Sequence, residues 1–346
     1  MKLNILHTLK NIYQLIILKM NISNYKVFCI AFLFLNASVG IDVYGQQRAQ
    51  YSQYMTNNYL LNPAVAGTTE HYEVRVGYRN QWTGMTDAPR TFYLTGQLHV
   101  GKHVGPYAGR SKHEPKNHHG LGIILFNDVT GPLSRTSAYL TYAYNMKLTK
   151  TLRMSVGMNV GYQQLSLDGS KVVMKNYNSN ISNGFSRGTI DGSLGAWLYD
   201  KKWYAGASVQ QIFQNKIFFN DYIAEGETYK FTNHYFLTGG LKLDLNPDLY
   251  LLPSVMIKYV TPAPASVDIN LKARWRDLLW LGASYRTNGS VVMIFGVTIS
   301  KMMEIFYSYD YVYGRNLAVT GYGSHEISIG IKPNPKGKVR SPSDFW

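Results

Sequence analysis

Short stretches in which apolar and polar residues alternate recur along most of this chain. Because successive side chains of a β-strand point to opposite faces, a period of two predicts strands with one apolar and one polar face. Stretches of about ten residues separated by turn residues are typical of membrane-spanning β-barrels. The fourteen alternating stretches lie at residues 71–82, 90–101, 118–129, 134–148, 151–167, 189–200, 203–213, 234–246, 249–261, 265–276, 278–288, 290–300, 303–313 and 324–332.

The connections between these stretches favour a barrel over a soluble sheet. Most connections from an even-numbered to an odd-numbered stretch are very short, whereas several in the other direction are long, such as 168–188, 214–233 and 314–323. Outer-membrane barrels have short periplasmic turns and longer outer loops. We therefore predict an all-β, single-domain transmembrane antiparallel β-barrel of about fourteen strands over residues 71–332, with both termini in the periplasm.

Two further features bear on this fold. The connection at 102–117 is long where a short turn is expected, so either a strand is misplaced or this segment is a periplasmic contact loop. Tyr and Trp residues lie near the ends of many stretches, where an aromatic girdle would meet the lipid headgroups. The residues expected in this girdle are Tyr78, Trp82, Trp203, Tyr204, Trp275, Trp280, Tyr311 and Tyr313.

The polar faces of the strands would line the lumen of such a barrel. With about fourteen strands the cylinder is roughly 28 Å across, which is too wide for opposing side chains to fill. The lumen therefore holds water, a plug or a guest molecule. Four charged residues are expected on the lumen side, either as a charged constriction or as an internal salt-bridge network: Asp268, Lys272, Arg274 and Asp310.

The N-terminal part of the chain resembles an export leader. Residues 1–45 combine flanking lysines with an apolar run from Val27 to Leu35, which predicts a signal peptide cleaved after Gly45, with translation starting at Met1 or at Met20. Residues 46–70 form an N-terminal periplasmic segment before the first strand. Its Asn-rich part, 50–68, is expected either to plug the barrel mouth or to be a lead-in that caps the lumen.

Composition excludes several classes of protein. The chain of 346 residues carries a formal charge of +15, but only 16% of its residues are charged and 14% are aromatic. The cations are spread along the chain, which argues against nucleic-acid binding. A single cysteine excludes a disulfide framework and a thiolate zinc site.

Catalytic and metal-binding signatures are absent. The sequence contains no nucleophile elbow, zinc-protease motif, phosphate-binding loop or dinucleotide fingerprint, so we predict no enzyme activity and no cofactor. Five histidines lie close together in sequence, but no carboxylate or cysteine completes a metal-ligand spacing, and a solvated loop is the favoured interpretation. These are His99, His103, His113, His118 and His119.

The segment after the last stretch, 333–346, is basic and cannot continue a strand because it is rich in proline. It is expected either to dock a periplasmic partner, through Lys336, Lys338 and Arg340, or to be a disordered tail.

Three segments together resemble the PorP/SprF family of outer-membrane proteins, which belongs to the type IX secretion and gliding apparatus of Bacteroidetes. They are QYSQYMTNNYLLNPAVAGT (50–68), YRNQWTGMTDAPRTF (78–92) and GSHEISIGI (323–331). The closing residues 341–346 resemble the family's usual ending, which places Phe345 and Trp346 with the basic docking residues. There, Ser343 and Asp344 replace an expected basic residue.

The resemblance implies an outer-membrane component that assists export or surface anchoring of large, adhesin-like proteins. Its implied partners are outer-membrane lipid, the periplasmic ring and peptidoglycan-linked proteins, the translocon, and the C-terminal domain of the secreted cargo. A passive porin and a ligand-binding surface barrel are the alternatives.

The hairpin from Arg79 is expected either to face a partner outside the cell or, as the favoured interpretation, to place Trp82 in the girdle. Candidate plug or partner-binding residues are Tyr51, Gln53, Tyr54, Asn57, Asn62, Pro63, Gly67, Arg79, Asn80, Gln81 and Trp82.

Overall fold

The computed structural model describes residues 51–69, 72–100, 117–172, 184–218, 228–300, 302–313 and 323–333. The expected signal peptide, all of the 102–117 connection except Asn117, and the docking residues of the tail lie outside the described residues. Within the described residues, no helix is long and apolar enough to cross a membrane.

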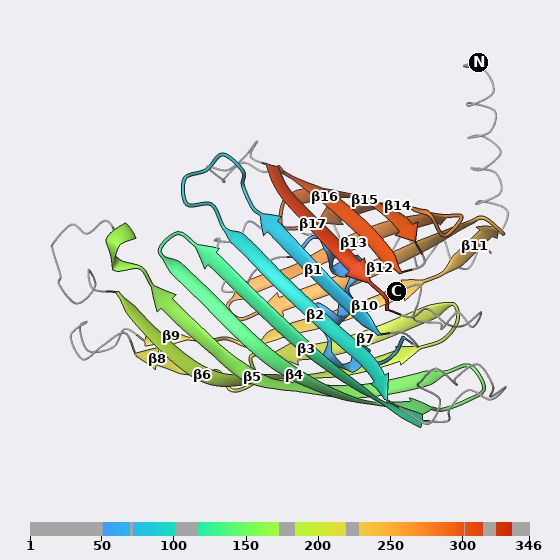
Figure 1. Ribbon diagram of the computed structural model, residues 1–346, viewed down its shortest axis with the longest axis horizontal. Coiled ribbons are helices and arrows are strands. Elements are labelled where there is room, and N and C mark those ends of the chain that lie inside the picture. The colour runs from blue at the N-terminus through green and yellow to red at the C-terminus, as the bar shows by residue number, and fades with distance from the viewer. Residues whose placement is uncertain are drawn as a thin grey trace, which may run out of the picture. The chain divides into compact units, whose positions relative to one another are not determined.

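Fourteen antiparallel strands form one closed ring, as the alternation predicts (Figure 1). The ring follows chain order, and it closes because β1 pairs with β17. On its far side β7 pairs with β10, and β10 with β12. The strands are β1 (Glu73–Asn80), β2 (Arg90–Val100), β3 (Asn117–Thr130), β4 (Leu133–Lys147), β5 (Arg153–Leu167), β6 (Phe185–Tyr199), β7 (Trp203–Gln210), β10 (His234–Leu241), β12 (Leu249–Val260), β13 (Ala263–Trp275), β14 (Leu279–Arg286), β15 (Ser290–Ser300), β16 (Met303–Val312) and β17 (Gly323–Ile331).

One expected stretch is broken in two, and two short strands were not expected from the alternation. β11 (Leu243–Asn246) lies within the expected stretch 234–246, prolongs β10 beyond a break at Lys242 and pairs with β12. β8 (Lys216–Phe218) and β9 (Thr228–Lys230) form a separate antiparallel pair in the connection between β7 and β10. None of the three adds a member to the closed ring.

The wall of the barrel has its polar face inside. On β17, Ser324, Glu326 and Ser328 are buried, whereas Ile327 and Ile329 are exposed. The same alternation holds around the ring, so the outer surface carries most of the exposed large apolar side chains. This is the arrangement that lipid outside and polar groups inside require.

Two members of the expected aromatic girdle face the lumen instead. Tyr204 and Trp280 are 6% and 5% exposed, whereas Tyr78 and Trp275 are exposed on the outer surface. The girdle prediction was therefore wrong for these two residues. The reason is the period of two: Trp203 and Tyr204 are neighbours in one strand and cannot both face lipid.

We call the end of the barrel at which β1 begins and β17 ends the terminal end, and the other the opposite end. Several turns at the terminal end are short, as at 148–152, 200–202 and 276–278, but the connection from β2 to β3 at this end spans 101–116. The opposite end carries long connections, including the loop 81–89 and the β8–β9 pair, together with short turns such as 131–132 and 261–262.

Candidate functional site

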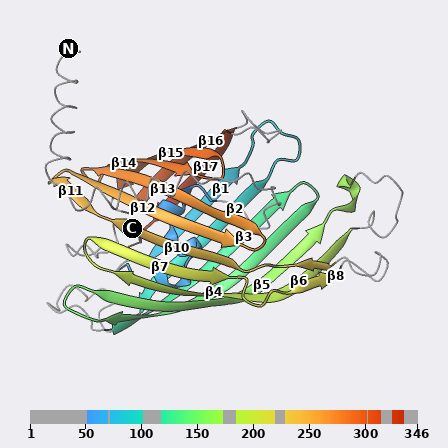
Figure 2. The same cartoon turned by 180° about the vertical axis from the view of Figure 1, so that it is seen from behind.

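Residues 51–68 lie inside the barrel, and every one of them is buried (Figures 1 and 2). We call this segment the plug. It consists of three 3-10 turns: η1 (Gln53–Thr56), η2 (Asn58–Leu60) and η3 (Pro63–Val65). Local sequence explains the last turn, because Asn62 Oδ1 accepts a hydrogen bond from Ala64 N at 2.9 Å and Pro63 begins the turn.

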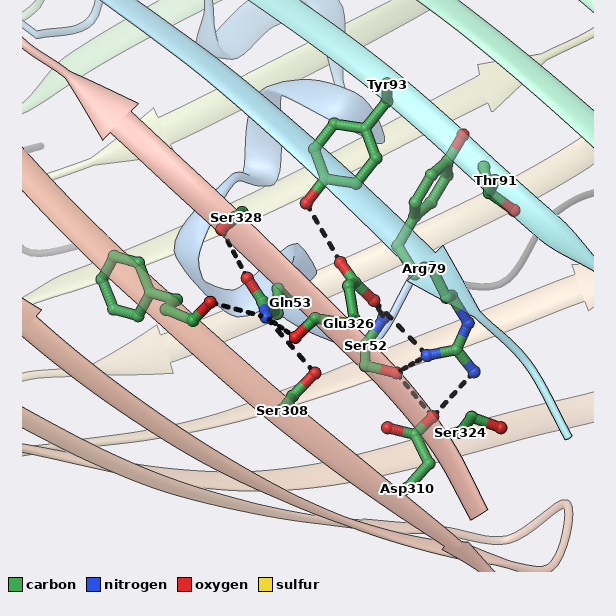
Figure 3. Close-up of polar contacts among 12 residues, drawn as sticks. Ser52, Gln53, Arg79, Thr91, Tyr93, Ser308, Asp310, Ser324, Glu326 and Ser328 are labelled. Carbon is green, nitrogen blue, oxygen red and sulfur yellow. Dashed lines mark hydrogen bonds and ion pairs between the residues drawn. The ribbon is translucent and has the colours of Figure 1, made fainter. Parts of the chain in front are cut away.

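The first half of the plug binds the wall where the ring closes (Figure 3). Ser52 N donates to Glu326 Oε2 at 2.7 Å, and Ser52 Oγ donates to Asp310 Oδ2 at 2.5 Å. Gln53 Nε2 donates to the carbonyl oxygen of Glu326 at 2.7 Å, and Gln53 Oε1 accepts from Ser328 Oγ. The plug is thus hydrogen-bonded to both β16 and β17.

Arg79 connects β1 to the same cluster. Its Nη2 lies 2.8 Å from Asp310 Oδ2, its Nη1 lies 3.4 Å from Glu326 Oε2, and Nη1 also donates to Ser52 Oγ. Tyr93 on β2 donates to the second oxygen of Glu326 at 3.0 Å. Two buried carboxylates are therefore neutralised and hydrogen-bonded by groups from the wall and from the plug together.

A second arginine extends this cluster around the ring. Arg286 on β14 lies 3.4 Å from both Asp310 Oδ2 and Asp268 Oδ2. Its Nη2 also donates to the carbonyl oxygen of Tyr51 at 3.1 Å. Tyr54 OH donates to Asp268 Oδ2 at 2.9 Å. Lys258 binds the same carboxylate at 2.7 Å.

The second half of the plug packs on the other side of the ring. Tyr59, Leu60 and Ala64 belong to one buried apolar cluster with wall residues such as Tyr139 and Trp197. Its side chains also make polar contacts: Tyr59 OH donates to Thr141 Oγ1 at 2.7 Å, and Asn62 Nδ2 donates to the carbonyl oxygen of Ala196 at 3.0 Å. This half is held by apolar burial, close backbone approach and hydrogen bonds together.

Glycine permits that close approach at the end of the plug. Gly67 has a backbone φ of 69°, which favours glycine. A Cβ atom on Gly120 of β3 would lie 2.1 Å from the carbonyl oxygen of Ala66. The plug backbone therefore lies directly against the wall at this position.

Wall side chains also hydrogen-bond the plug's own carbonyl oxygens. The contacts are Lys272 Nζ to Met55 O (2.8 Å), Ser208 Oγ to Leu61 O (2.7 Å), Gln210 Nε2 to Leu61 O (2.9 Å), Asn145 Nδ2 to Ala66 O (3.2 Å) and His118 Nε2 to Gly67 O (2.9 Å). An irregular segment in the lumen needs such partners, since its backbone lacks a regular ladder.

A cavity lies between the plug and the wall at the terminal end. This polar cavity, of about 50 Å³, lies beside Asn57 and Thr68 of the plug and Glu73, Arg75 and Glu304 of the wall. A water molecule occupies about 30 Å³ of liquid. The cavity is therefore large enough for a few water molecules.

The structure brings most of the candidate residues together. Tyr51, Gln53, Tyr54, Asn57, Asn62, Pro63 and Gly67 lie in the plug, and Arg79 binds it. Asn80 ends β1. Gln81 and Trp82 lie in the loop 81–89, where Trp82 has an unusual φ of 51° and its N–H donates to Ser324 Oγ at 3.1 Å.

Among the expected lumen charges, Asp268 and Asp310 belong to the salt-bridge cluster and Lys272 binds a plug carbonyl. Arg274 does not join them: it pairs with Asp277 at 3.3 Å and lies over Trp280. Lys336, Lys338, Arg340, Phe345 and Trp346 lie outside the described residues.

Sequence reasoning missed five residues that complete the cluster. Ser52, Tyr93, Lys258, Arg286 and Glu326 were not candidates, although Ser52 and Glu326 stand in the segments that carry the family resemblance. Glu326 also sits on the polar face of an alternating stretch, which is the signal that could have found it.

The solvated-loop interpretation of the histidines was wrong for those that the structure describes. His99 and His118 lie on β2 and β3, are 5% and 4% exposed, and stack with ring centroids 3.9 Å apart. His119 faces outward beside Tyr142. His103 and His113 lie outside the described residues. In the part of the chain that the structure describes, no group of three His, Cys, Asp or Glu residues could hold a metal ion.

Comparison with known proteins gives one family and several fold neighbours. Residues 43–331 match the family described as type IX secretion system membrane protein PorP/SprF. No individual curated protein matches the chain.

Three solved structures are similar to this chain in fold. A Pseudomonas aeruginosa FadL homologue shares 10% identity over 78% of this chain and 92% of its own, with a TM-score of 0.45. The Pseudomonas putida toluene transporter TodX shares 11% identity over 79% of this chain and 91% of its own, with a TM-score of 0.42. The translocator domain of autotransporter NalP from Neisseria meningitidis shares 10% identity over 75% and 86%, with a TM-score of 0.40.

Proposed function

This chain belongs to the PorP/SprF family of type IX secretion system membrane proteins, and on that premise we propose that it assists the export or cell-surface anchoring of large surface proteins. It acts by binding cargo on one side and periplasmic machinery on the other, as part of a Bacteroidetes secretion and gliding apparatus. Its role is to bind these partners and to position them relative to one another, without a catalytic step.

The observation that carries this proposal is the filled lumen. The plug is hydrogen-bonded to strands on opposite sides of the ring, from β16 and β17 to β3, β4 and β7. A barrel whose interior is occupied by its own chain is suited to presenting surfaces to partners rather than to conducting solutes.

We further propose an orientation for the barrel in the outer membrane. The terminal end, with its short turns, faces the periplasm, and the cleaved chain begins there after a signal peptide. The basic tail 333–346 then lies on the periplasmic side, where it docks the ring and peptidoglycan-linked proteins. The loop 81–89 faces the cell exterior and is available to the C-terminal domain of the cargo.

The surface and secreted proteins of a deletion strain, compared with those of its parent, test this function. Loss of one or a few large exported proteins, with the others intact, is the result expected of a cargo-specific partner. Loss of every type IX cargo would instead assign the protein to the core of the machine. An unchanged exported proteome would contradict the proposal.

A passive porin makes a different prediction in a planar bilayer. The plugged barrel is expected to show negligible conductance, whereas a porin would conduct steadily. Sustained conductance of the full chain would therefore favour the porin and would count against a closed lumen.

A further inference from the structure

The cavity between the plug and the wall carries more positive than negative charge. Among the described residues that line it are two carboxylates and three cations: Glu73, Glu304, Arg75, Lys272 and Lys332. Arg75 Nη2 lies 2.9 Å from Glu73 Oε1 and 3.7 Å from Glu304 Oε2. Lys332 Nζ lies 3.3 Å from the same oxygen of Glu304. Both carboxylates are therefore already paired, and Lys272 is the cation left over.

Lys272 is buried, with an exposed fraction of 7%, and no described carboxylate lies within ion-pairing distance of its ammonium group. Its Nζ donates to the carbonyl oxygen of Met55 at 2.8 Å and lies 4.8 Å from the centre of the Trp280 ring. A carbonyl dipole and a ring face offset only part of a full charge. A buried ammonium group beside a polar cavity is therefore stabilised further by an anion in that cavity.

Unsatisfied N–H donors lie around the same cavity. Trp280 Nε1 and the Nε and Nη1 atoms of Arg75 have no hydrogen-bond partner within the part of the chain that the structure describes. Both side chains are almost fully buried, and both line the cavity. Since buried donors are normally paired, an acceptor inside the cavity would satisfy groups that the wall and the plug leave open.

A glycine lets the aromatic side chains of this wall approach one another. Gly296 on β15 pairs with Trp280 on one side and with Phe306 on the other. A Cβ atom at Gly296 would overlap the Phe306 ring and would lie 3.1 Å from Trp280 Cβ. The two ring centres are 6.1 Å apart, and Arg75 Cζ lies 5.1 Å from the centre of the Phe306 ring. The rings thus connect the side of the cavity at Lys272 to the side at Arg75.

We propose that this cavity binds one small monovalent anion, of the size of chloride or formate. The Lys272 ammonium group is its counter-ion, and the free N–H groups of Trp280 and Arg75 are further donors. A cavity of about 50 Å³ has room for such an ion with some water. Thr69 and Lys332 line it and are partly exposed, so the ion enters from the terminal end.

The bound ion would also stabilise the seated plug. Thr56, Asn57 and Tyr59 of the plug line the cavity together with the wall residues. An ion that binds this arrangement and not the unfolded chain favours it by mass action. The proposal requires only a folded barrel, so it stands or falls independently of the proposed role in secretion.

Thermal unfolding of the detergent-purified protein, followed by circular dichroism, tests this site. Sodium chloride or sodium formate replaces sodium gluconate at constant ionic strength, because gluconate is much larger than either probe. The midpoint of unfolding is expected to rise with chloride and with formate and then to level off. Saturation is expected because a ligand that binds one site of the folded state stabilises it in proportion to occupancy.

Two variants and a control connect the response to the cavity. Lys272→Gln removes the counter-ion and is expected to raise the half-saturating chloride concentration by about tenfold or more. Trp280→Phe keeps a ring but removes the N–H, and an increase of about threefold or more is expected. Arg276→Gln removes a positive charge from an exposed surface pair and is expected to leave that concentration unchanged.

Glu70, which follows Thr69 in sequence and lies outside the described residues, provides the test for a counter-ion within the chain. No saturable response in the wild type, with a response gained in Glu70→Gln, would overturn the proposal in favour of that carboxylate. No response in either protein would overturn it in favour of an uncharged Lys272.

Heat-modifiable migration in SDS gels verifies that each variant forms a folded barrel. An equal response to gluconate, or an unchanged half-saturating concentration in both Lys272→Gln and Trp280→Phe, would also contradict the proposed site.

Discussion

Individual charged side chains inside this barrel are buried together with their partners. Arg79 and Arg286 are almost fully buried, as are the carboxylates of Asp268, Asp310 and Glu326. Isolated charges in such a place would be very costly, but here each carboxylate has a cation within hydrogen-bonding or ion-pairing distance. The plug contributes Ser52 to the same cluster, so its seating depends on side chains that belong to the wall.

At this scale we predict the effect of Arg79→Gln. The change removes a cation that pairs with two buried carboxylates, those of Asp310 and Glu326. Removing one partner of a buried pair costs about 3–5 kcal/mol. The midpoint of urea unfolding of the barrel in lipid vesicles, followed by tryptophan fluorescence, is expected to fall accordingly.

Arg276→Gln is the matched control, because Arg276 is exposed and pairs with Asp248 at the surface. Its expected effect is within about 0.5 kcal/mol. Equal stability of the two variants would show that the buried cluster does not stabilise the fold.

At the scale of elements, the two halves of the plug contact different parts of the wall. η1 and the residue before it are hydrogen-bonded to β16 and β17, whereas the second half combines apolar packing with hydrogen bonds to β3, β4, β6 and β7. The end of the plug needs glycine on both sides, at Gly67 and Gly120. The two halves are therefore sensitive to different substitutions.

Gly120→Ala is predicted to loosen the end of the plug without opening the ring. The new Cβ atom overlaps the carbonyl oxygen of Ala66, and overpacking of this kind costs about 1–3 kcal/mol. A thiol reporter at Thr68, introduced as Thr68→Cys in a Cys29→Ser background, is expected to react with maleimide at least about tenfold faster in the variant.

The control for this experiment is Gly282→Ala. A Cβ atom there meets its nearest neighbour, Ile294 Cβ, at 3.4 Å, which is ordinary contact. Its labelling rate should match that of the reporter alone. The close-approach argument fails if both alanine variants label at the same rate.

At the scale of the whole barrel, closure determines which distant segments meet. β1 and β17 are at opposite ends of the barrel sequence, yet Val76 pairs with Ile329 and Arg79 with Glu326. This pairing creates the cluster that holds the plug, and it closes the ring of described strands, so that each of them has a partner on both sides.

The proposed orientation predicts a labelling pattern in cells. Thr83 lies in the loop at the opposite end and Lys150 in a turn at the terminal end, and both are exposed. In the Cys29→Ser background, Thr83→Cys is expected to react with a membrane-impermeant maleimide on intact cells. Lys150→Cys is expected to react only after the outer membrane is opened. The reverse pattern would show that the barrel has the opposite orientation in the membrane.

The sequence alone determined the number of strands in the ring, their approximate bounds and, in the clearest stretches, which residues face the lumen. This was possible because the two-residue period of a strand is a local property of the chain, as in the polar positions of 265–276 and 324–332. Local pattern also identified the segment 50–68 as distinct from the strands, since its asparagines and Pro63 do not suit one.

Only the tertiary structure decided where the plug lies and which charges hold it. Arg79 and Glu326 are 247 residues apart along the chain, and Tyr54 reaches Asp268 across 214 residues. No local pattern encodes such pairs, because they arise when the ring closes around the plug. The inward placement of Tyr204, Trp280 and His118 has the same origin, since a side chain's face follows from register and not from its residue type.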